Sequence, residues 1–203
     1  LIGQFAGEIS SDEGRIELFG ADVTHVRTHL RAQMGLARTY QVTQLAKEFT
    51  ALDNVLLAVN ARAKHNFRFW GNAHDDASSM QKAAAALATV GMSGMHDATV
   101  GTMAHGEQRQ LEIAMALATE PKLLLLDEPL AGMSQGESSA IVALLKSLKG
   151  RYPMLLVEHD MDAVFALADR VSVLVYGRII ATDTPDRIRE HREVRAAYLG
   201  DVA

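Results

Sequence analysis

The 203-residue sequence contains no cysteine, which excludes a disulfide framework and fits a reducing compartment such as the cytosol. No apolar run approaches the roughly 20 residues that a membrane-spanning helix needs, so a membrane role would require a partner chain. The opening LIGQFAGE has neither a starting Met nor the basic region of a signal peptide. A net charge of −5 argues against a general nucleic-acid binder, because such domains usually display a basic face.

One phosphate-binding motif is also missing. No G-x-x-x-x-G-K-[ST] P-loop occurs in the 203 residues, and no other Gly-Lys-Ser/Thr sequence replaces it. Internal repeats and low-complexity tracts are absent as well. The rest of the composition, with 48% apolar and 22% charged residues, is typical of a globular chain of one medium-sized domain with room for an inserted subdomain.

The strongest chemical signal lies between Met103 and Met133. An apolar run that ends at Leu126 predicts a parallel strand covered on both faces. Asp127 and Glu128 follow it directly, and Pro129 prevents the strand from continuing. The carboxyl end of a central strand is where ligands of α/β sheets bind. The alternative is a strand that is simply followed by acidic loop residues.

The segments on either side of this strand favour a ligand-binding site over a strand that is simply followed by acidic residues. Upstream, a glycine loop at His105–Gln108 opens a predicted helix, and a helix N-terminus offers free N–H groups and a positive dipole end to phosphate. The helix is indicated by apolar residues at helical spacing: Leu111, Ala114, Met115 and Ala118. Downstream, the apolar segment Met154–Val157 predicts another strand, which ends in Glu158-His159-Asp160.

These pieces, in this order, resemble the ATP-binding cassette (ABC) ATPases, and most closely the branched-chain amino acid branch of the importers. The resemblance covers nearly the whole chain and is carried by three segments: Gly106–Gln108, Leu124–Pro129 and Val157–Met161. It implies an α/β fold with a P-loop NTPase-type (RecA-like) core and an inserted helical subdomain. Residues 1–41 and 112–203 would form a partial core, and residues 42–111 the helical subdomain with the signature loop.

The resemblance also implies roles for single residues. Asp127 corresponds to the aspartate that supports Mg²⁺, usually through water, and Glu128 to the general base that polarises the attacking water. His159 corresponds to the switch histidine, which contacts the γ-phosphate. Gln41, after a predicted strand from Leu36, corresponds to the Mg²⁺ and water ligand of the Q-loop. A glutamine after a strand is otherwise an ordinary surface residue.

The signature loop, residues 104–107, departs from the family pattern. Ala104 replaces a serine whose hydroxyl reaches the γ-phosphate, His105 a glycine or aromatic residue, and Glu107 a glutamine. Gly106 and the helix N-terminus remain, so we expect the nucleotide contacts of the backbone to persist. In the following loop, Ser134 stands where Asp or Asn is common, and it is a further nucleotide-binding candidate.

The expected function is that of an ATPase subunit that uses ATP and Mg²⁺ to power import of branched-chain amino acids or similar small solutes. Its expected partners are integral-membrane permease subunits and a second ATPase subunit, without nucleic acid, and its location is cytoplasmic and peripheral on the inner face of the membrane. Two alternatives stay open: a soluble ABC-type ATPase acting on nucleic acid or the ribosome, and a non-hydrolysing scaffold. In the family, the P-loop lysine would lie roughly six to seven residues before Leu1. We therefore expect the chain to be a fragment that lacks Walker A and is inactive alone.

Several local predictions complete the sequence analysis. Arg15–Phe19 alternates like a half-buried strand, and Thr28–Met34 is expected to be a helix that ends at Gly35. Asp53 is expected to cap the next helix. Residues 64–79 read as a loop whose aromatic side chains either pack locally, which we favour, or contact a partner. The charged C-terminal segment predicts a solvated helix.

Overall fold

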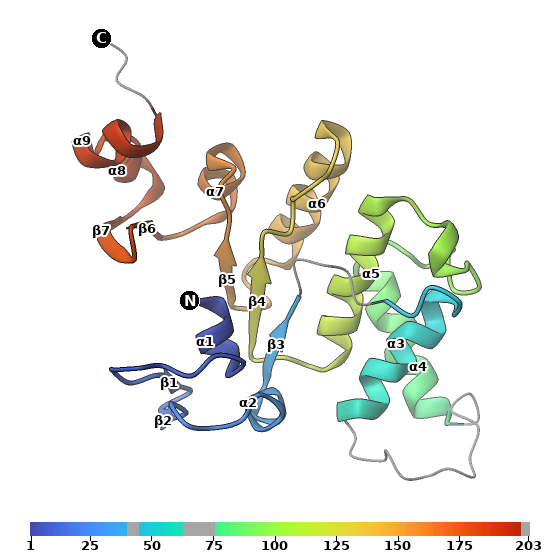
Figure 1. Ribbon diagram of the computed structural model, residues 1–203. Coiled ribbons are helices and arrows are strands. Elements are labelled where there is room, and N and C mark those ends of the chain that lie inside the picture. Colours follow the sequence, from blue (N-terminus) through green and yellow to red (C-terminus); the bar gives the residue numbers. More distant parts are fainter. Residues whose placement is uncertain (40–44, 63–75, 200–203) are drawn as a thin grey trace. The chain divides into compact units, whose positions relative to one another are not determined.

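A computed structural model describes residues 1–39, 45–62 and 76–199 of the chain (Figure 1). The chain divides into two compact units, Leu1–Val157 and Glu158–Ala203. Gln41 and most of the segment 64–79 lie outside the described residues, so the predictions made for them stay predictions.

The first unit is organised around a parallel sheet. Its described strands are β3 (Leu36–Arg38), β4 (Leu123–Asp127) and β5 (Met154–Val157), in the order β3-β4-β5. Leu125 of β4 lies opposite Arg38 on one side and Leu155 on the other. The three leucines that precede Asp127 are at most 1% exposed, whereas all four residues of β5 are only partly buried. The predicted buried parallel strand is thus confirmed, with β4 at the centre.

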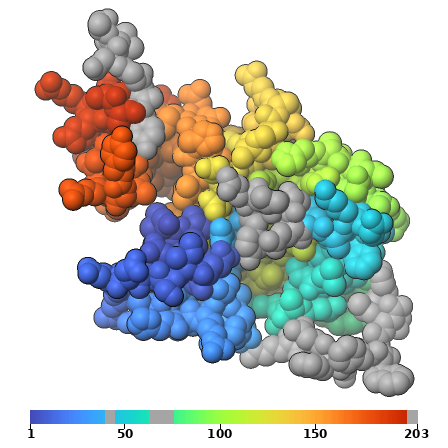
Figure 2. Space-filling view, in the orientation of Figure 1, coloured from blue at the N-terminus to red at the C-terminus, as the bar shows by residue number. Residues whose placement is uncertain are grey.

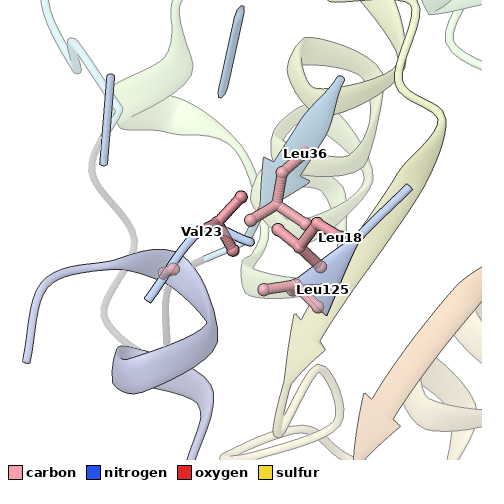
Figure 3. Close-up of a cluster of buried hydrophobic side chains, with 5 residues drawn as sticks. Leu18, Val23, Leu36 and Leu125 are labelled. Atoms are coloured by element: carbon pink, nitrogen blue, oxygen red, sulfur yellow. The ribbon is translucent and has the colours of Figure 1, made fainter. Parts of the chain in front are cut away.

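The N-terminal segment packs against this sheet through apolar side chains. It contains α1 (Ile2–Ala6), β1 (Glu17–Leu18), β2 (Ala21–Asp22) and α2 (Thr28–Met34). A buried cluster joins the segment to the sheet, and its members are Ala6, Leu18, Val23, Leu36 and Leu125 (Figure 3). The same segment, blue in Figure 2, forms a continuous region of surface. Helix α2 has its predicted bounds and ends at Gly35, whose φ of 112° is strongly disfavoured for other residues.

The strand predicted from Arg15 to Phe19 is shorter in the structure. Strand β1 contains only two residues and pairs antiparallel with β2. Phe19 adopts a φ of 52° and Gly20 one of 79°, and a strand cannot continue through this left-handed turn. The alternating pattern therefore identified a strand but not its end.

A group of helices follows the N-terminal segment. Helices α3 (Ala51–Arg62), α4 (Ala77–Thr89) and α5 (His105–Ala118) pack on one another, and the short 3-10 helix η2 (Val100–Thr102) precedes α5. Leu52, Leu56 and Val59 of α3 are buried. The assignment of this group to a separate subdomain, residues 42–111, stays a prediction.

The predicted cap of α3 is wrong by three residues. Thr50, not Asp53, precedes the helix, and its hydroxyl accepts a hydrogen bond of 3.1 Å from the Asp53 N–H. The Asp53 carboxylate accepts in return from the hydroxyl and the N–H of Thr50, at 2.6 and 3.2 Å. This reciprocal arrangement is a capping box, in which the acidic residue is the third of the helix rather than the cap.

Helix α6 (Gln135–Leu148) lies between β4 and β5 in the chain and packs against α5. Its apolar face is buried and consists of Ile141, Leu144, Leu145 and Leu148. The position of α6 brings its N-terminus close to that of α5, which matters for the site described below.

The second unit contains a β-hairpin. Its elements are α7 (Met161–Leu167), β6 (Val171–Val175), β7 (Arg178–Asp183), α8 (Pro185–Glu190), α9 (Arg192–Val194) and the π-helical turn η3 (Arg195–Leu199). Strands β6 and β7 pair antiparallel. The prediction of a solvated C-terminal helix is partly wrong, because Val194 is fully buried in a cluster with Val171, Val173 and Ile188.

Candidate functional site

Asp127, the last residue of β4, is held by an arginine from the neighbouring strand. The Arg38 Nη2 donates to the Asp127 Oδ2 at 2.9 Å, and the Arg38 Nη1 forms an ion pair with Glu8. Burial lowers the pKa of Arg38, but the hydrogen bonds to the two carboxylates outweigh it and raise that pKa overall. The guanidinium, only 15% exposed, therefore fixes the orientation of Asp127 at the carboxyl end of the sheet.

Glu128 lies immediately beyond the strand in a left-handed conformation, with a φ of 45°. Its N–H donates to the Val157 carbonyl at 2.9 Å, and its carbonyl accepts from the Ala131 N–H at 3.1 Å. Such a conformation costs a non-glycine residue on the order of 1–3 kcal/mol and is concentrated at functional sites. Strand alternation does not set the direction of Glu128, because the residue lies outside β4 in this left-handed turn.

The N-terminus of α5 binds carboxylates of the chain itself. Ala104, the residue before the helix, donates its N–H to the Glu107 Oε2 at 2.8 Å. Gly106 donates its N–H to the Glu137 Oε1 of α6 at 2.9 Å. Because a helix N-terminus favours negative charge, these contacts fit the anion-binding character predicted for the signature loop.

Glu137 also completes the N-terminus of its own helix. Its Oε2 accepts from the Ser134 hydroxyl at 2.7 Å and from the Ser134 N–H at 3.0 Å. The hydrogen bonds from Ser134, followed by that from the Gly106 N–H, lower the pKa of Glu137 to about 2. The Glu137 side chain is therefore ionised at neutral pH and is shared by two helix N-termini.

The structure thus brings together some of the predicted site residues. The signature loop and Ser134 are linked through Glu137, and a side chain at Gly132 would lie 3.8 Å from the His105 Nε2. Asp127 and Glu128 are together at the end of β4.

His159 belongs to the second unit, where its N–H donates to the Glu158 Oε2 at 3.0 Å and its side chain is 73% exposed. Gln41 lies outside the described residues. The predicted roles of His159 and Gln41 therefore stay predictions.

Two residues of this region were missed by the sequence analysis, Arg38 and Glu137. Glu137 had a local signal, because Ser134 and Glu137 have the S-x-x-E spacing of a capping box. Its bond to Gly106, 31 residues away, had none. Arg38 had no local signal either, since its partner Asp127 is 89 residues away and is reached only by strand pairing.

The donor set at β4 can be compared with the needs of a metal ion. Among the described residues, no three His, Cys, Asp or Glu side chains gather as metal ligands. Mg²⁺ commonly keeps several waters and takes one or two carboxylates together with substrate phosphates. Asp127, partly exposed at the sheet edge, fits this pattern of a single protein carboxylate.

No helix in the described part of the chain combines the length and apolar composition needed to cross a membrane. This finding agrees with the absence of a long apolar run in the sequence.

Comparisons with known proteins agree with these features. A family model described as "ABC transporter" matches residues 1–131, and one described as "Branched-chain amino acid ATP-binding cassette transporter" matches residues 178–203. The chain is 35% identical over 195 residues to the high-affinity branched-chain amino acid transport ATP-binding protein BraF of Pseudomonas aeruginosa, covering 93% of this chain and 76% of that protein. It is 34% identical over 178 residues to the corresponding protein LivG of Escherichia coli, covering 84% and 69%.

A solved structure of an ATP-binding cassette of an ABC transporter superposes with a TM-score of 0.83 at 28% identity, covering 97% of this chain and 81% of that one. The parallel sheet with carboxylates after its central strand is therefore that of a P-loop NTPase-type α/β protein, as the sequence analysis expected. The chain belongs to the ABC transporter ATPase family, whose members bind and hydrolyse ATP.

Proposed function

We propose that this chain is the ATP-hydrolysing subunit of an importer for branched-chain amino acids or similar small solutes. The proposal rests on the pair Asp127–Glu128 at the end of the central parallel strand, in a chain that also has the signature helix and the cited relatives. The second family match, at residues 178–203, supports the amino-acid branch of the family. These matches favour the importer over a soluble cassette that acts on nucleic acid or the ribosome, and over a non-hydrolysing scaffold.

In this proposal Asp127 acts on the metal ion and Glu128 on the attacking water. Asp127, held by Arg38, would support Mg²⁺ through water, and the bound ion would offset the charge of the nucleotide phosphates. Glu128 would accept a proton from the attacking water, and its turn conformation would direct its carboxylate away from the strand.

The signature loop would act on a nucleotide held by a second ATPase subunit. In this arrangement, the backbone of Ala104–Glu107 and the side chain of Ser134 contact the nucleotide across a dimer. The positive end of α5 supports this assignment, because it already attracts carboxylates within the chain. Ala104 lacks the serine hydroxyl of other members, so backbone groups would supply the contacts at that position.

His159 and Gln41 would complete the site. The His159 imidazole would hold Glu128 and the attacking water in register, and the Gln41 amide would be a ligand of water and Mg²⁺. The support for both roles is the position of each residue in the family pattern.

Integral-membrane permease subunits would be the partners that ATP-driven closure of the dimer moves. The relatives BraF and LivG are transport ATP-binding proteins, which supports this assignment. The chain would then be cytoplasmic and attached to the inner face of the membrane through the permease.

The test is uptake of radiolabelled leucine, isoleucine and valine by cells in which the full-length gene is deleted. We expect uptake to fall after deletion, to recover with the wild-type gene and not to recover with the Glu128→Gln gene. Normal uptake of all three amino acids in the deleted strain, with loss of uptake of a different solute, would refute the assigned substrate class while leaving the ATPase assignment intact.

A further inference from the structure

We infer that Glu137 is a positioning residue for ATP hydrolysis, because its carboxylate joins the signature loop to the loop that follows Glu128. The inference rests on the proposed function, since it concerns how the signature loop is held for the nucleotide. Glu137 itself is not assigned a contact with the nucleotide.

The first observation is that one carboxylate serves two helices. The Oε1 of Glu137 accepts from the Gly106 N–H of α5, whereas its Oε2 accepts from the N–H and hydroxyl of Ser134 before α6. A capping glutamate needs only the contacts within its own helix, as Glu107 illustrates with its bond to Ala104. The additional bond from Glu137 to Gly106 is therefore a link between two loops.

The second observation is that Gly106 leaves room for this link. A Cβ added at Gly106 would lie 3.0 Å from the Cγ, 3.2 Å from the Cβ and 3.3 Å from the Oε1 of Glu137. Glu137 has little freedom to move away, because it is a residue of α6 and is hydrogen-bonded to Ser134. A side chain at position 106 would therefore force Glu137 to shift, independently of any nucleotide.

The link couples the position of the signature loop to that of the loop 128–134. The loop 128–134 begins at the proposed general base, and the signature loop begins α5. Because Glu137 binds both loops at neutral pH as an anion, displacement of one loop is transmitted to the other. A misplacement of about 1 Å in a positioned group can cost ~10²-fold in rate, so loss of the link should reduce turnover more than ATP affinity.

The kinetic test uses the full-length protein assembled with its permease. We expect Glu137→Ala to lower kcat by about 10-fold or more while the KM for ATP changes by less than about 3-fold. Glu137→Gln should be intermediate, because a single amide oxygen can accept from only one helix N-terminus.

The matched control is Asp76→Ala. Asp76 also caps a helix, accepting from the Ser78 N–H at 3.0 Å and the Ser79 hydroxyl at 2.7 Å, and its helix α4 carries none of the proposed site residues. We expect this variant to retain the wild-type kcat. A Glu137→Ala enzyme with a kcat within about 2-fold of wild type would overturn the positioning role.

A double-mutant cycle on thermal stability tests the link without ATP hydrolysis. Gly106→Ala should lower Tm by roughly 2–4 °C in the wild-type background and by a smaller amount in the Glu137→Ala background, because the contacts with the Cγ and Oε1 are then absent and only that with the Cβ remains. Equal effects in the two backgrounds would refute the contact. A wild-type complex that hydrolyses no ATP would refute the proposed function, and the cycle would still decide whether the link exists.

Discussion

Two pairs of carboxylates in the first unit differ in the groups that bind them and in their backbone conformation. At the helix N-termini, Glu107 and Glu137 accept hydrogen bonds from the backbone N–H groups of Ala104, Gly106 and Ser134. At the end of β4, Asp127 is paired with an arginine and Glu128 follows in a strained backbone conformation.

The comparison shows that charge alone does not identify a catalytic acid. The Ser134 hydroxyl and the N–H groups of Ser134 and Gly106 lower the pKa of Glu137 to about 2, so this carboxylate cannot accept a proton near neutral pH. A general base needs an orientation that is fixed by the surrounding structure, and the left-handed turn at Glu128 provides one. We therefore assign a structural role to Glu107 and Glu137. The proposed catalytic roles belong to Asp127 and Glu128 at the end of the strand.

The largest effect is expected from Glu128→Gln in the full-length protein. The amide keeps the shape of the side chain but cannot accept a proton from water, so turnover should fall ~10²–10⁴-fold while ATP binding persists. ATPase rate and ATP-dependent dimerisation, measured side by side, check this expectation. The control is Glu17→Gln, an exposed carboxylate of β1 that should leave turnover unchanged. Turnover within a few-fold of wild type for Glu128→Gln would place Glu128 with the structural carboxylates.

The next effect is expected from Arg38→Met, measured by urea unfolding. The substitution removes the partner of two partly buried carboxylates, Asp127 and Glu8, so the free energy of unfolding should fall by about 1–3 kcal/mol. Arg15→Met is the matched control, because Arg15 is 62% exposed and its ion pairs should contribute only ~0–1 kcal/mol. Equal losses in the two variants would contradict a special role of Arg38.

A smaller effect is expected from Ser134→Ala. The variant removes the side-chain cap of α6 and one hydrogen bond to Glu137, which should lower the free energy of unfolding by ~1 kcal/mol. Ser139→Ala, on the same helix, removes only a bond to the Gln135 carbonyl and should have little effect. Thermal unfolding of the two variants distinguishes a cap from an ordinary surface serine, and a neutral Ser134→Ala would argue against the cap.

The smallest effect is the acid dependence of stability that Glu137 contributes. Its pKa is about 2 in the folded chain against an ordinary value of 4.5, so its contribution is complete above about pH 4.5 and is lost as the pH falls toward 2. The difference in Tm between wild type and Glu137→Gln should therefore narrow between about pH 7 and about pH 3. A difference that widens with acid would mean that the carboxylate is not stabilised by folding.

Much of the fold was predictable because it follows local patterns. The apolar run before Asp127 predicted a buried parallel strand, and the residues Thr28–Met34 and Gly35 predicted a helix and its end. Element ends that depend on single backbone angles, such as the turn at Phe19, were not predictable from alternation. The capping of α3 by Thr50 was misassigned because either a hydroxyl or a carboxylate can precede a helix.

The sequence by itself determined the family motifs: the acidic pair at the end of β4, the glycine motif at the start of α5 and the histidine two residues after β5. Tertiary structure decided which carboxylates are available for chemistry. Glu137 meets Gly106 only because α6 packs against α5, and Arg38 meets Asp127 only because β3 pairs with β4. These contacts join residues 31 and 89 positions apart, and no local pattern encodes separations of that size, since they depend on how the elements pack.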